Sequence, residues 1–266
     1  MPAPKGPTRR RLLVGAAGGL GSTALAGCRG GVQIQEDSGT LQTTHWPGVS
    51  PTWRMLKPVG AKGLVIALHG VGLTGPKMMD LLEFRPHAER TQLAVAAISG
   101  GNTYWHKRRD GSDTGALVIK DFLPFALQKC ALPASAKVAF LGLSMGGYGS
   151  LLLASELGPK RVFGVVAESA ALWTEPGLSA PGAFDDREDF LAHDVFARGK
   201  ALRDIPIRID CGITDPFADA NRVFVDKVVP HAKATFDSGG HTGDYWREHA
   251  GVQMDWLAGL LKRVTT

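Results

Sequence analysis

Residues 137–146 read KVAFLGLSMG, and residues 147–157 continue as GYGSLLLASEL. The apolar run before Gly142 predicts a buried strand, and the residues after Gly146 predict a helix. Gly142 and Gly146 carry no Cβ, so the strand and the helix can approach closely while Ser144 adopts strained backbone angles. The segment therefore predicts a sharp strand-to-helix turn that presents the Ser144 hydroxyl as a nucleophile.

Strand-like and helix-like segments alternate on both sides of this turn. Strands are predicted at residues 63–68, 93–98, 137–141, 163–168, 205–211 and 233–238. Helices are predicted at residues 76–91, 115–129, 146–158, 216–229 and 245–263. Continuous apolar strands that alternate with helices indicate an α/β fold, in which a mostly parallel central sheet has helices on both faces. The sequence thus predicts a single α/β domain over residues 41–266.

Residues 169–204 interrupt this alternation, because proline, glycine and charged residues leave no regular period. The segment follows a predicted strand, so it is placed where it could cover the carboxyl edge of the sheet. We expect a short lid-like insertion or pocket wall that carries Trp173. The alternative is an ordinary surface loop that has no role at the site.

Residues 1–27 have the order of an export signal. Arginines at positions 9 to 11 precede a short, uncharged and moderately apolar stretch, which ends in Leu25-Ala26-Gly27-Cys28. This stretch is too short and too rich in glycine for a comfortable membrane span. The arginine pair suggests twin-arginine export (Tat), and Leu-Ala-Gly-Cys resembles the bacterial lipobox, in which the cysteine becomes the lipidated first residue of the mature chain.

The lipobox resemblance implies an exported lipoprotein of the cell envelope. We expect a lipid at Cys28 to hold it to the outer face of the bacterial cytoplasmic membrane, with residues 28–40 as a flexible tether. A plain cleaved signal with an incidental cysteine is the alternative. The leader holds four basic side chains and no acidic one, so its removal takes four of the formal +5 charges. The high pI is therefore no argument for nucleic-acid binding.

Cys130 and Cys211 are the cysteines that follow Cys28. Cys130 precedes the strand that leads to Ser144, whereas Cys211 ends another strand of the same sheet, so their separation exceeds what a disulfide tolerates. Neither stands in a Cys-x-x-Cys or Cys/His spacing, so we predict no metal site. The basic cluster at residues 106–109 is interpreted as a solvated loop, although it could line a cleft.

A serine nucleophile needs a base, and the base needs a partner that fixes its tautomer and stabilises the imidazolium. Of the eight histidines, His241 has the best position, because it follows the last strand at the carboxyl edge where Ser144 also lies. Asp215 follows Cys211 at the carboxyl end of another strand. The chain order Ser144, Asp215, His241 is that of the α/β hydrolases.

Other residues compete for the acidic role. Asp215 precedes Pro216, so it could simply cap a helix. Asp219 lies one turn further along that helix and is the second choice for the acid. Glu168 ends a different strand and is less well placed.

Attack by a serine on a carbonyl creates an oxyanion, which needs backbone N–H donors. The N–H of Met145, directly after the nucleophile, is the first candidate. The second donor is expected from the loop that follows the strand at residues 63–68. We choose the N–H of Val71, with Gly70 as the alternative.

Three motifs carry a resemblance to a known family: GLSMGGYG at residues 142–149, CGITDPF at 211–217 and GGHTGDYW at 239–246. Together they resemble the esterase family of the α/β hydrolases, in the branch that includes esterase D, feruloyl-esterase-like enzymes and the exported mycolyltransferases. The resemblance covers most of residues 60–262. It implies the α/β-hydrolase fold, a Ser/Asp/His triad, no metal and no organic cofactor. Trp105, in the loop after residues 99–101, and Trp246, five residues after His241, are expected as pocket walls, as is Trp173.

The resemblance implies a serine carboxylesterase that hydrolyses acyl esters through an acyl-enzyme. Because no long apolar insertion is visible, a small acyl group fits better than a very long one. The substrate is expected to be a small-molecule or glycan-linked ester. Two alternatives stay open: an acyltransferase to a cell-envelope sugar, and a non-catalytic envelope binding protein on the same fold.

Overall fold

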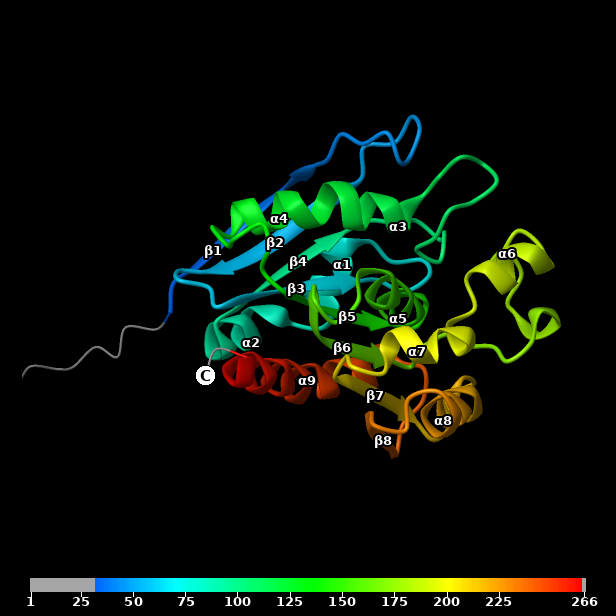
Figure 1. The fold of residues 1–266 in the computed structure, drawn as a ribbon. Coiled ribbons are helices and arrows are strands. Elements are labelled where there is room, and N and C mark those ends of the chain that lie inside the picture. Colours follow the sequence, from blue (N-terminus) through cyan, green and yellow to red (C-terminus); the bar gives the residue numbers. More distant parts are fainter. Residues whose placement is uncertain (1–31, 265–266) are drawn as a thin grey trace, which may run out of the picture. The chain divides into compact units, whose positions relative to one another are not determined.

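The computed structural model describes residues 32–264. In this part of the chain, eight strands form one sheet in the order β1-β2-β4-β3-β5-β6-β7-β8 (Figure 1). The strands are Ile34–Thr40 (β1), Thr52–Pro58 (β2), Gly63–Leu68 (β3), Leu93–Ile98 (β4), Val138–Leu143 (β5), Val162–Glu168 (β6), Ile207–Gly212 (β7) and Lys233–Asp237 (β8). β2 pairs antiparallel with both β1 and β4, and the strands from β3 to β8 run parallel to one another.

Helices connect the parallel strands. They are Gly75–Leu81 (α1), Phe84–Thr91 (α2), Thr114–Ala116 (α3), Leu123–Lys129 (α4), Met145–Leu157 (α5), Arg187–Ala192 (α6), Gly199–Leu202 (α7), Ala218–Lys227 (α8) and Gly243–Val264 (α9). A π-helical segment at Leu117–Phe122 joins α3 to α4, and 3-10 turns lie at Pro176–Leu178 and Val195–Arg198. None of the helices within residues 32–264 combines the length and the apolar character needed to cross a bilayer.

Each face of the sheet has its own hydrophobic core. On one face, α1, α2 and α9 pack over the central strands around Leu82, Phe84 and Met254. On the other face lie α4, α5 and α8, whose core includes Phe122, Leu152 and Phe224. Since the central strands are buried on both faces, they consist of continuous apolar residues rather than an alternating pattern. The predicted fold class is therefore confirmed.

The sequence pattern did not predict the two antiparallel strands, β1 and β2, at one edge of the sheet. Residues 34–40 were expected to belong to a flexible tether, yet they form β1 and pair in register with β2. The prediction of a tether is wrong for this segment. Its side chains are mostly polar and exposed, as on an edge strand, so they carry little of the apolar signal that reveals a strand.

The predicted helix at residues 76–91 is two helices, α1 and α2. Glu83 separates them because its backbone has a left-handed conformation, with φ of 48°. A residue in this conformation cannot continue an α-helix, so the chain turns before Phe84. The export signal and the lipidation site at Cys28 lie outside the described residues, whereas Cys130 and Cys211 are both free thiols.

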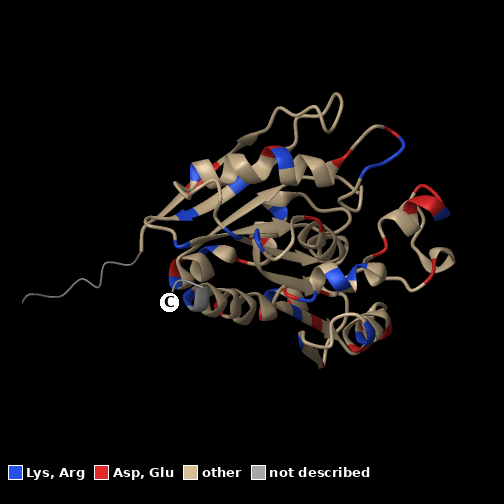
Figure 2. Ribbon diagram, viewed as in Figure 1, with Lys and Arg blue, Asp and Glu red and all other residues tan. Residues whose placement is uncertain are grey.

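The insertion at residues 169–204 begins at the carboxyl end of β6 and contains α6 and α7 (Figure 1). α6 lies beyond the edge of the sheet, whereas α7 packs against α5 and leads back to the start of β7. Figure 2 shows acidic residues gathered at α6 and basic residues along the loop that precedes α3. Arg108 of this loop forms an ion pair with Asp185, and Arg109 forms one with Asp186. The cluster at residues 106–109 therefore fastens the insertion to the domain rather than only facing solvent.

Candidate active site

Ser144 lies at the sharp turn between β5 and α5 that the sequence predicts. Its backbone angles, φ of 55° and ψ of −120°, are unusual for a residue with a side chain. A Cβ at Gly146 would lie 1.8 Å from the carbonyl oxygen of Leu68, and one at Gly142 would lie 2.0 Å from the carbonyl oxygen of Gly146. Only glycine fits at these two positions, so the two residues allow the strand and the helix to meet.

Three side chains from separate loops meet at the carboxyl edge of the sheet. Asp215 follows β7, and His241 lies between β8 and α9. The Nε2 atom of His241 is 3.0 Å from Oγ of Ser144, and its Nδ1 atom is 2.9 Å from Oδ2 of Asp215. An Nδ1–H that donates to the carboxylate leaves the Nε2 lone pair to accept the serine proton. The structure thus brings together all three residues that the sequence selects.

Asp215 is held in its ionised form. Burial opposes its ionisation, but hydrogen bonds from His241, from the N–H of Phe217 and from Ser169 outweigh this effect and lower its pKa below the ordinary value. Oδ1 accepts the N–H of Phe217 at 2.9 Å, at the entrance to α8, while Oδ2 faces His241. The carboxyl group therefore caps the turn before the helix and orients the imidazole at the same time.

The alternative acids lie elsewhere. The Asp219 side chain is 99% exposed and pairs with Arg222. Glu168 is fully buried within the sheet, where burial and the nearby charge of Asp210 raise its pKa well above the ordinary value. Among these three acids, only Asp215 has a hydrogen bond to His241 in the described part of the chain.

The loop after β3 packs directly on the turn at Ser144. A Cβ at Gly70 would lie 3.2 Å from Cβ of Ser144. His69 fixes the loop, because its Nε2 accepts the N–H of Gly100 at 2.9 Å and its Nδ1–H donates to the carbonyl of Gly70 at 2.8 Å. Burial lowers the pKa of His69 to about 4, so the ring is neutral and keeps this tautomer.

The expected oxyanion donors, Val71 and Met145, belong to the loop after β3 and to the start of α5. Val71 is exposed at the tip of the loop after β3. Met145 opens α5, where backbone N–H groups have no partner inside the helix and the helix dipole favours negative charge. Both N–H groups therefore belong to segments that adjoin Ser144.

A serine that the sequence analysis did not select also contacts the triad. Ser169 directly follows β6, is fully buried and has a φ of 46°. Its Oγ accepts the indole N–H of Trp246 at 3.0 Å, and the same hydroxyl hydrogen-bonds to Asp215. The Trp246 ring packs edge-on against His241, with ring centroids 4.9 Å apart. The position of Ser169, directly after a parallel strand, was the sequence signal that could have identified this residue.

The tryptophans expected to line a pocket differ in their positions. Trp246 adjoins His241, as described above. Trp173 lines a mainly apolar cavity of about 480 Å³ together with Phe217, whose ring centroid is 5.3 Å from that of His241. Trp105 is 0% exposed and packs against His69 in the core. It does not line the cavity beside Phe217, but it contributes to a second cavity, of about 330 Å³, with His106 and His193.

Comparisons with known proteins agree with this geometry. The family model Esterase, described as "Putative esterase", matches residues 117–250. FphF, a fluorophosphonate-binding serine hydrolase of Staphylococcus aureus, has 16% identity and a TM-score of 0.74, with 85% of this chain and 98% of that chain covered. A ferulic acid esterase has 20% identity and a TM-score of 0.70, with 86% and 99% covered.

A third similar structure is an S-formylglutathione hydrolase from Agrobacterium tumefaciens, with 17% identity, a TM-score of 0.71 and 86% and 96% of the two chains covered. A comparison with curated proteins gives no match. The solved structures establish the fold, and the family model covers about half of the sequence. The chain belongs to the esterase family of the α/β hydrolases and is a carboxylic ester hydrolase.

Proposed function

We propose that this protein is a serine carboxylesterase that works through an acyl-enzyme intermediate. The observation that carries the proposal is the hydrogen-bonded chain from Ser144 through His241 to Asp215. In the first half-reaction, Nε2 of His241 takes the hydroxyl proton while Oγ of Ser144 attacks the carbonyl carbon of the ester. The carboxylate of Asp215 stabilises the imidazolium that forms.

The N–H groups of Met145 and Val71 donate to the oxyanion of the tetrahedral intermediate. A donor of this kind typically contributes about 3 to 4 kcal/mol to the lowering of the barrier. The intermediate then collapses, the ester C–O bond breaks, and His241 returns its proton to the departing alkoxide. In the second half-reaction, His241 deprotonates a water molecule that attacks the acyl-enzyme, and the free acid leaves. The cycle needs no metal and no organic cofactor.

The cavity beside Phe217 supports an ester with an apolar group of small or medium size. Its volume of about 480 Å³ and its lining by Trp173, Leu178 and Val223 suit a compact hydrocarbon or aromatic group. The insertion supplies Trp173 and Leu178, and α8 supplies Val223. We therefore expect the insertion to select the substrate, whereas the sheet edge performs the chemistry.

Replacement of Ser144 and Asp215 tests the mechanism. Ser144→Ala should lower the hydrolysis of a nitrophenyl acyl ester by roughly 10⁴-fold or more, should abolish labelling by a fluorophosphonate probe, and should leave the melting temperature nearly unchanged. Asp215→Asn should lower kcat by a similar order, because the imidazole loses the partner that fixes its tautomer. The matched control is Asp226→Asn, which changes an exposed aspartate farther along α8 and should keep full activity. Full activity in Ser144→Ala would disprove the proposal.

We also propose that the protein is exported and carries a lipid at Cys28. The support is the order of arginines, apolar stretch and Leu-Ala-Gly-Cys in the sequence. In a bacterial host, radiolabelled palmitate should enter the wild-type protein and the Cys130→Ala control, but not Cys28→Ala. Unchanged processing and a soluble product when lipoprotein signal peptidase is inhibited would rule out the anchor.

A further inference from the structure

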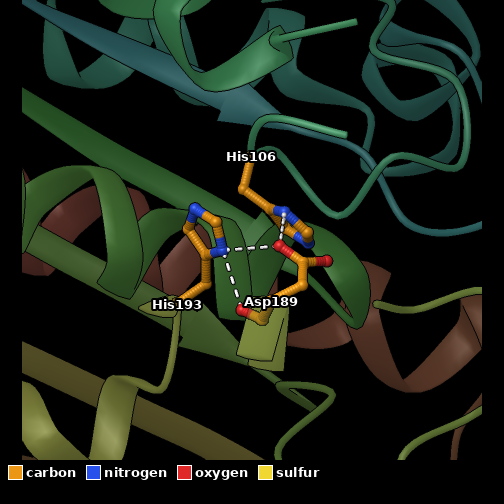
Figure 3. Close-up of side chains that lie close together, drawn as sticks. All are labelled: His106, Asp189 and His193. Carbon is orange, nitrogen blue, oxygen red and sulfur yellow. Dashed lines mark hydrogen bonds and ion pairs between the residues drawn. The ribbon is translucent and has the colours of Figure 1, made fainter. Parts of the chain in front are cut away.

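Two histidines and an aspartate meet where the insertion joins the rest of the domain. His106 comes from the loop between β4 and α3, whereas Asp189 lies in α6 and His193 directly follows it. Figure 3 shows both imidazole rings beside the Asp189 carboxylate. The side chain of His106 is only 1% exposed, and that of Asp189 is 12% exposed. These residues are outside the triad and have no role in the proposed ester hydrolysis.

The distances among these groups suit a shared metal ion. Oδ1 of Asp189 is 2.9 Å from Nδ1 of His193 and 3.5 Å from Nδ1 of His106. The same Nδ1 atom of His193 lies 2.9 Å from the backbone carbonyl oxygen of Asp189, a hydrogen bond that a metal ion would replace. Ligand atoms that each lie about 2.1 Å from one metal, at angles of 90° to 110°, are about 3.0 to 3.4 Å apart. The two imidazole rings stack face to face, with centroids 4.3 Å apart and an interplanar angle of 27°. The rings must therefore rotate before both Nδ1 lone pairs point at one cation.

The surroundings of His106 also favour a cation at Nδ1. Its Nε2 atom faces the carbonyl oxygen of Ala183 at 3.2 Å, and its Nδ1 atom faces the carbonyl oxygen of Lys107 at 3.0 Å. A neutral ring has one N–H, so one of its nitrogens would point a lone pair at an oxygen. An Nε2–H that donates to Ala183 leaves the Nδ1 lone pair for a metal. A backbone carbonyl that fixes the ring in this way is common beside metal-bound histidines.

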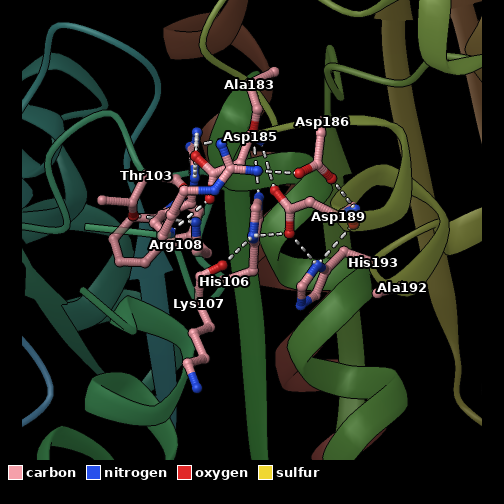
Figure 4. Close-up of polar contacts among 12 residues, drawn as sticks. Thr103, His106, Lys107, Arg108, Ala183, Asp185, Asp186, Asp189, Ala192 and His193 are labelled. Carbon is pink, nitrogen blue, oxygen red and sulfur yellow. Dashed lines mark hydrogen bonds and ion pairs between the residues drawn. The ribbon is translucent and has the colours of Figure 1, made fainter. Parts of the chain in front are cut away.

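Other contacts hold the remaining two ligands in place (Figure 4). Oδ2 of Asp189 accepts the N–H of Asp185 at 2.8 Å, which leaves Oδ1 directed at the histidines. The carbonyl of His193 accepts the hydroxyl of Tyr148, which lies on the helix that begins after Ser144. An adjacent cavity of about 330 Å³ is lined by His106, His193 and Glu156, so water molecules have room to complete the coordination shell.

We propose that His106, Asp189 and His193 form a binding site for one divalent transition-metal ion such as Zn²⁺. Two imidazoles and a carboxylate are a donor set that Zn²⁺ and its neighbours in the first transition row prefer over Mg²⁺ or Ca²⁺. The ion fastens the insertion to the loop before α3, next to the ion pair between Arg108 and Asp185. Its role is structural, because the ester mechanism proposed above does not use it.

A metal titration of the full chain, first treated with a chelator, tests the proposal. Isothermal calorimetry should show one Zn²⁺ ion bound with a micromolar or lower Kd, and saturation should raise the melting temperature by roughly 5 °C. Co²⁺ should give the visible absorption bands of a nitrogen- and oxygen-ligated ion. His106→Gln, Asp189→Asn and His193→Gln should each weaken binding by at least tenfold. The control is His231→Gln, which changes a histidine outside the site and should bind as the wild type does.

Two results would overturn the proposal. The first is wild-type protein that shows no saturable binding below a millimolar concentration of Zn²⁺. This result would mean that hydrogen bonds between the histidines and Asp189 hold the three side chains together without a metal ion. The second is unchanged affinity in His106→Gln and Asp189→Asn. Because the wild-type titration decides the first case, a variant that fails to fold does not obscure the result. Hydrolysis by the chelated protein would separately show that the esterase proposal stands without the metal.

Discussion

At the scale of single residues, two buried serines at the active site adopt unusual backbone angles. Ser144 and Ser169 both have positive φ, a conformation that costs a residue with a side chain about 1 to 3 kcal/mol. Each hydroxyl contacts the triad: Oγ of Ser144 faces His241, and that of Ser169 faces Asp215. The strain therefore occurs at side chains that the proposed reaction requires to be held in position.

We expect Ser169→Ala to lower kcat by about tenfold with little change in KM. Loss of its hydroxyl removes a hydrogen bond that lowers the pKa of Asp215 and leaves the indole N–H of Trp246 without this acceptor. The carboxylate becomes easier to protonate, so the acid limb of the kcat/KM profile should move to higher pH. Kinetics measured from pH 4 to 9 check both effects.

The control for this prediction is Ser155→Ala. Ser155 is also buried, but its hydroxyl donates to a carbonyl within α5 and does not touch the triad. Its pH profile should match that of the wild type. If Ser169→Ala lost only stability and kept both kcat and the profile, its role would be structural packing and not positioning of Asp215.

At the scale of elements, the contact between β3, β5 and α5 depends on glycine. Gly146 lies against the carbonyl of Leu68 at the end of β3, and Gly142 lies under the first turn of α5. α5 is buried along most of its length, so it cannot shift outward without exposing its apolar side chains on all sides. The turn at Ser144 thus depends on the close packing of β3, β5 and α5 as well as on its own backbone angles.

Gly146→Ala should destabilise the protein by about 3 kcal/mol or more, because its methyl group would collide with backbone that has no room to move. Gly177→Ala is the matched control: no atom lies within 4 Å of the added Cβ, so its effect should stay within about 0.5 kcal/mol. Urea unfolding of both variants gives the two free energies. Equal stability of the two variants would contradict the packing argument.

At the scale of the whole molecule, a buried polar cluster links the sheet to the last helix. Glu168 on β6 pairs in register with Asp210 on β7. Asp210 accepts hydrogen bonds from Arg208 at 2.6 Å and from Gln253 of α9 at 3.0 Å. Burial and the charge of Asp210 raise the pKa of Glu168 well above its ordinary value, so this carboxyl group keeps its proton in the folded protein at pH values where the unfolded chain loses it.

This difference makes stability depend on pH. Because the folded pKa is raised, the contribution of Glu168 is fully present below its unfolded pKa and is lost as pH rises toward the folded pKa, by about 1.4 kcal/mol per pH unit at most. Glu168→Gln does not titrate, so its stability relative to the wild type should increase from pH 5 to pH 8. Urea unfolding at both pH values measures the change, with the exposed Glu248→Gln on α9 as control. An equal difference at pH 5 and pH 8 would show that Glu168 does not titrate in this way.

The sequence alone predicts the parallel part of the sheet and the position of the triad. Long apolar strands and the glycines around Ser144 leave few other structures open, and parallel strands bring their carboxyl ends to one edge, where Asp215 and His241 follow. Neither β1 nor β2 was predicted. The mostly polar side chains of β1 give no apolar period, and its pairing with β2 fixes its conformation.

Contacts between residues of distant loops are decided by the tertiary structure and cannot be predicted from the local sequence. Ser169 has no recognisable spacing to the triad. Asp189 and His193 are four residues apart, but His106 lies in the loop before α3, far from both of them in the sequence. The local pattern of a chain reports burial and backbone geometry, so it determines the sheet, the turn at Ser144 and the order of the triad. Which loops touch above that sheet is decided by packing and by ion pairs such as Arg108 with Asp185, and these contacts form only when the whole chain has folded.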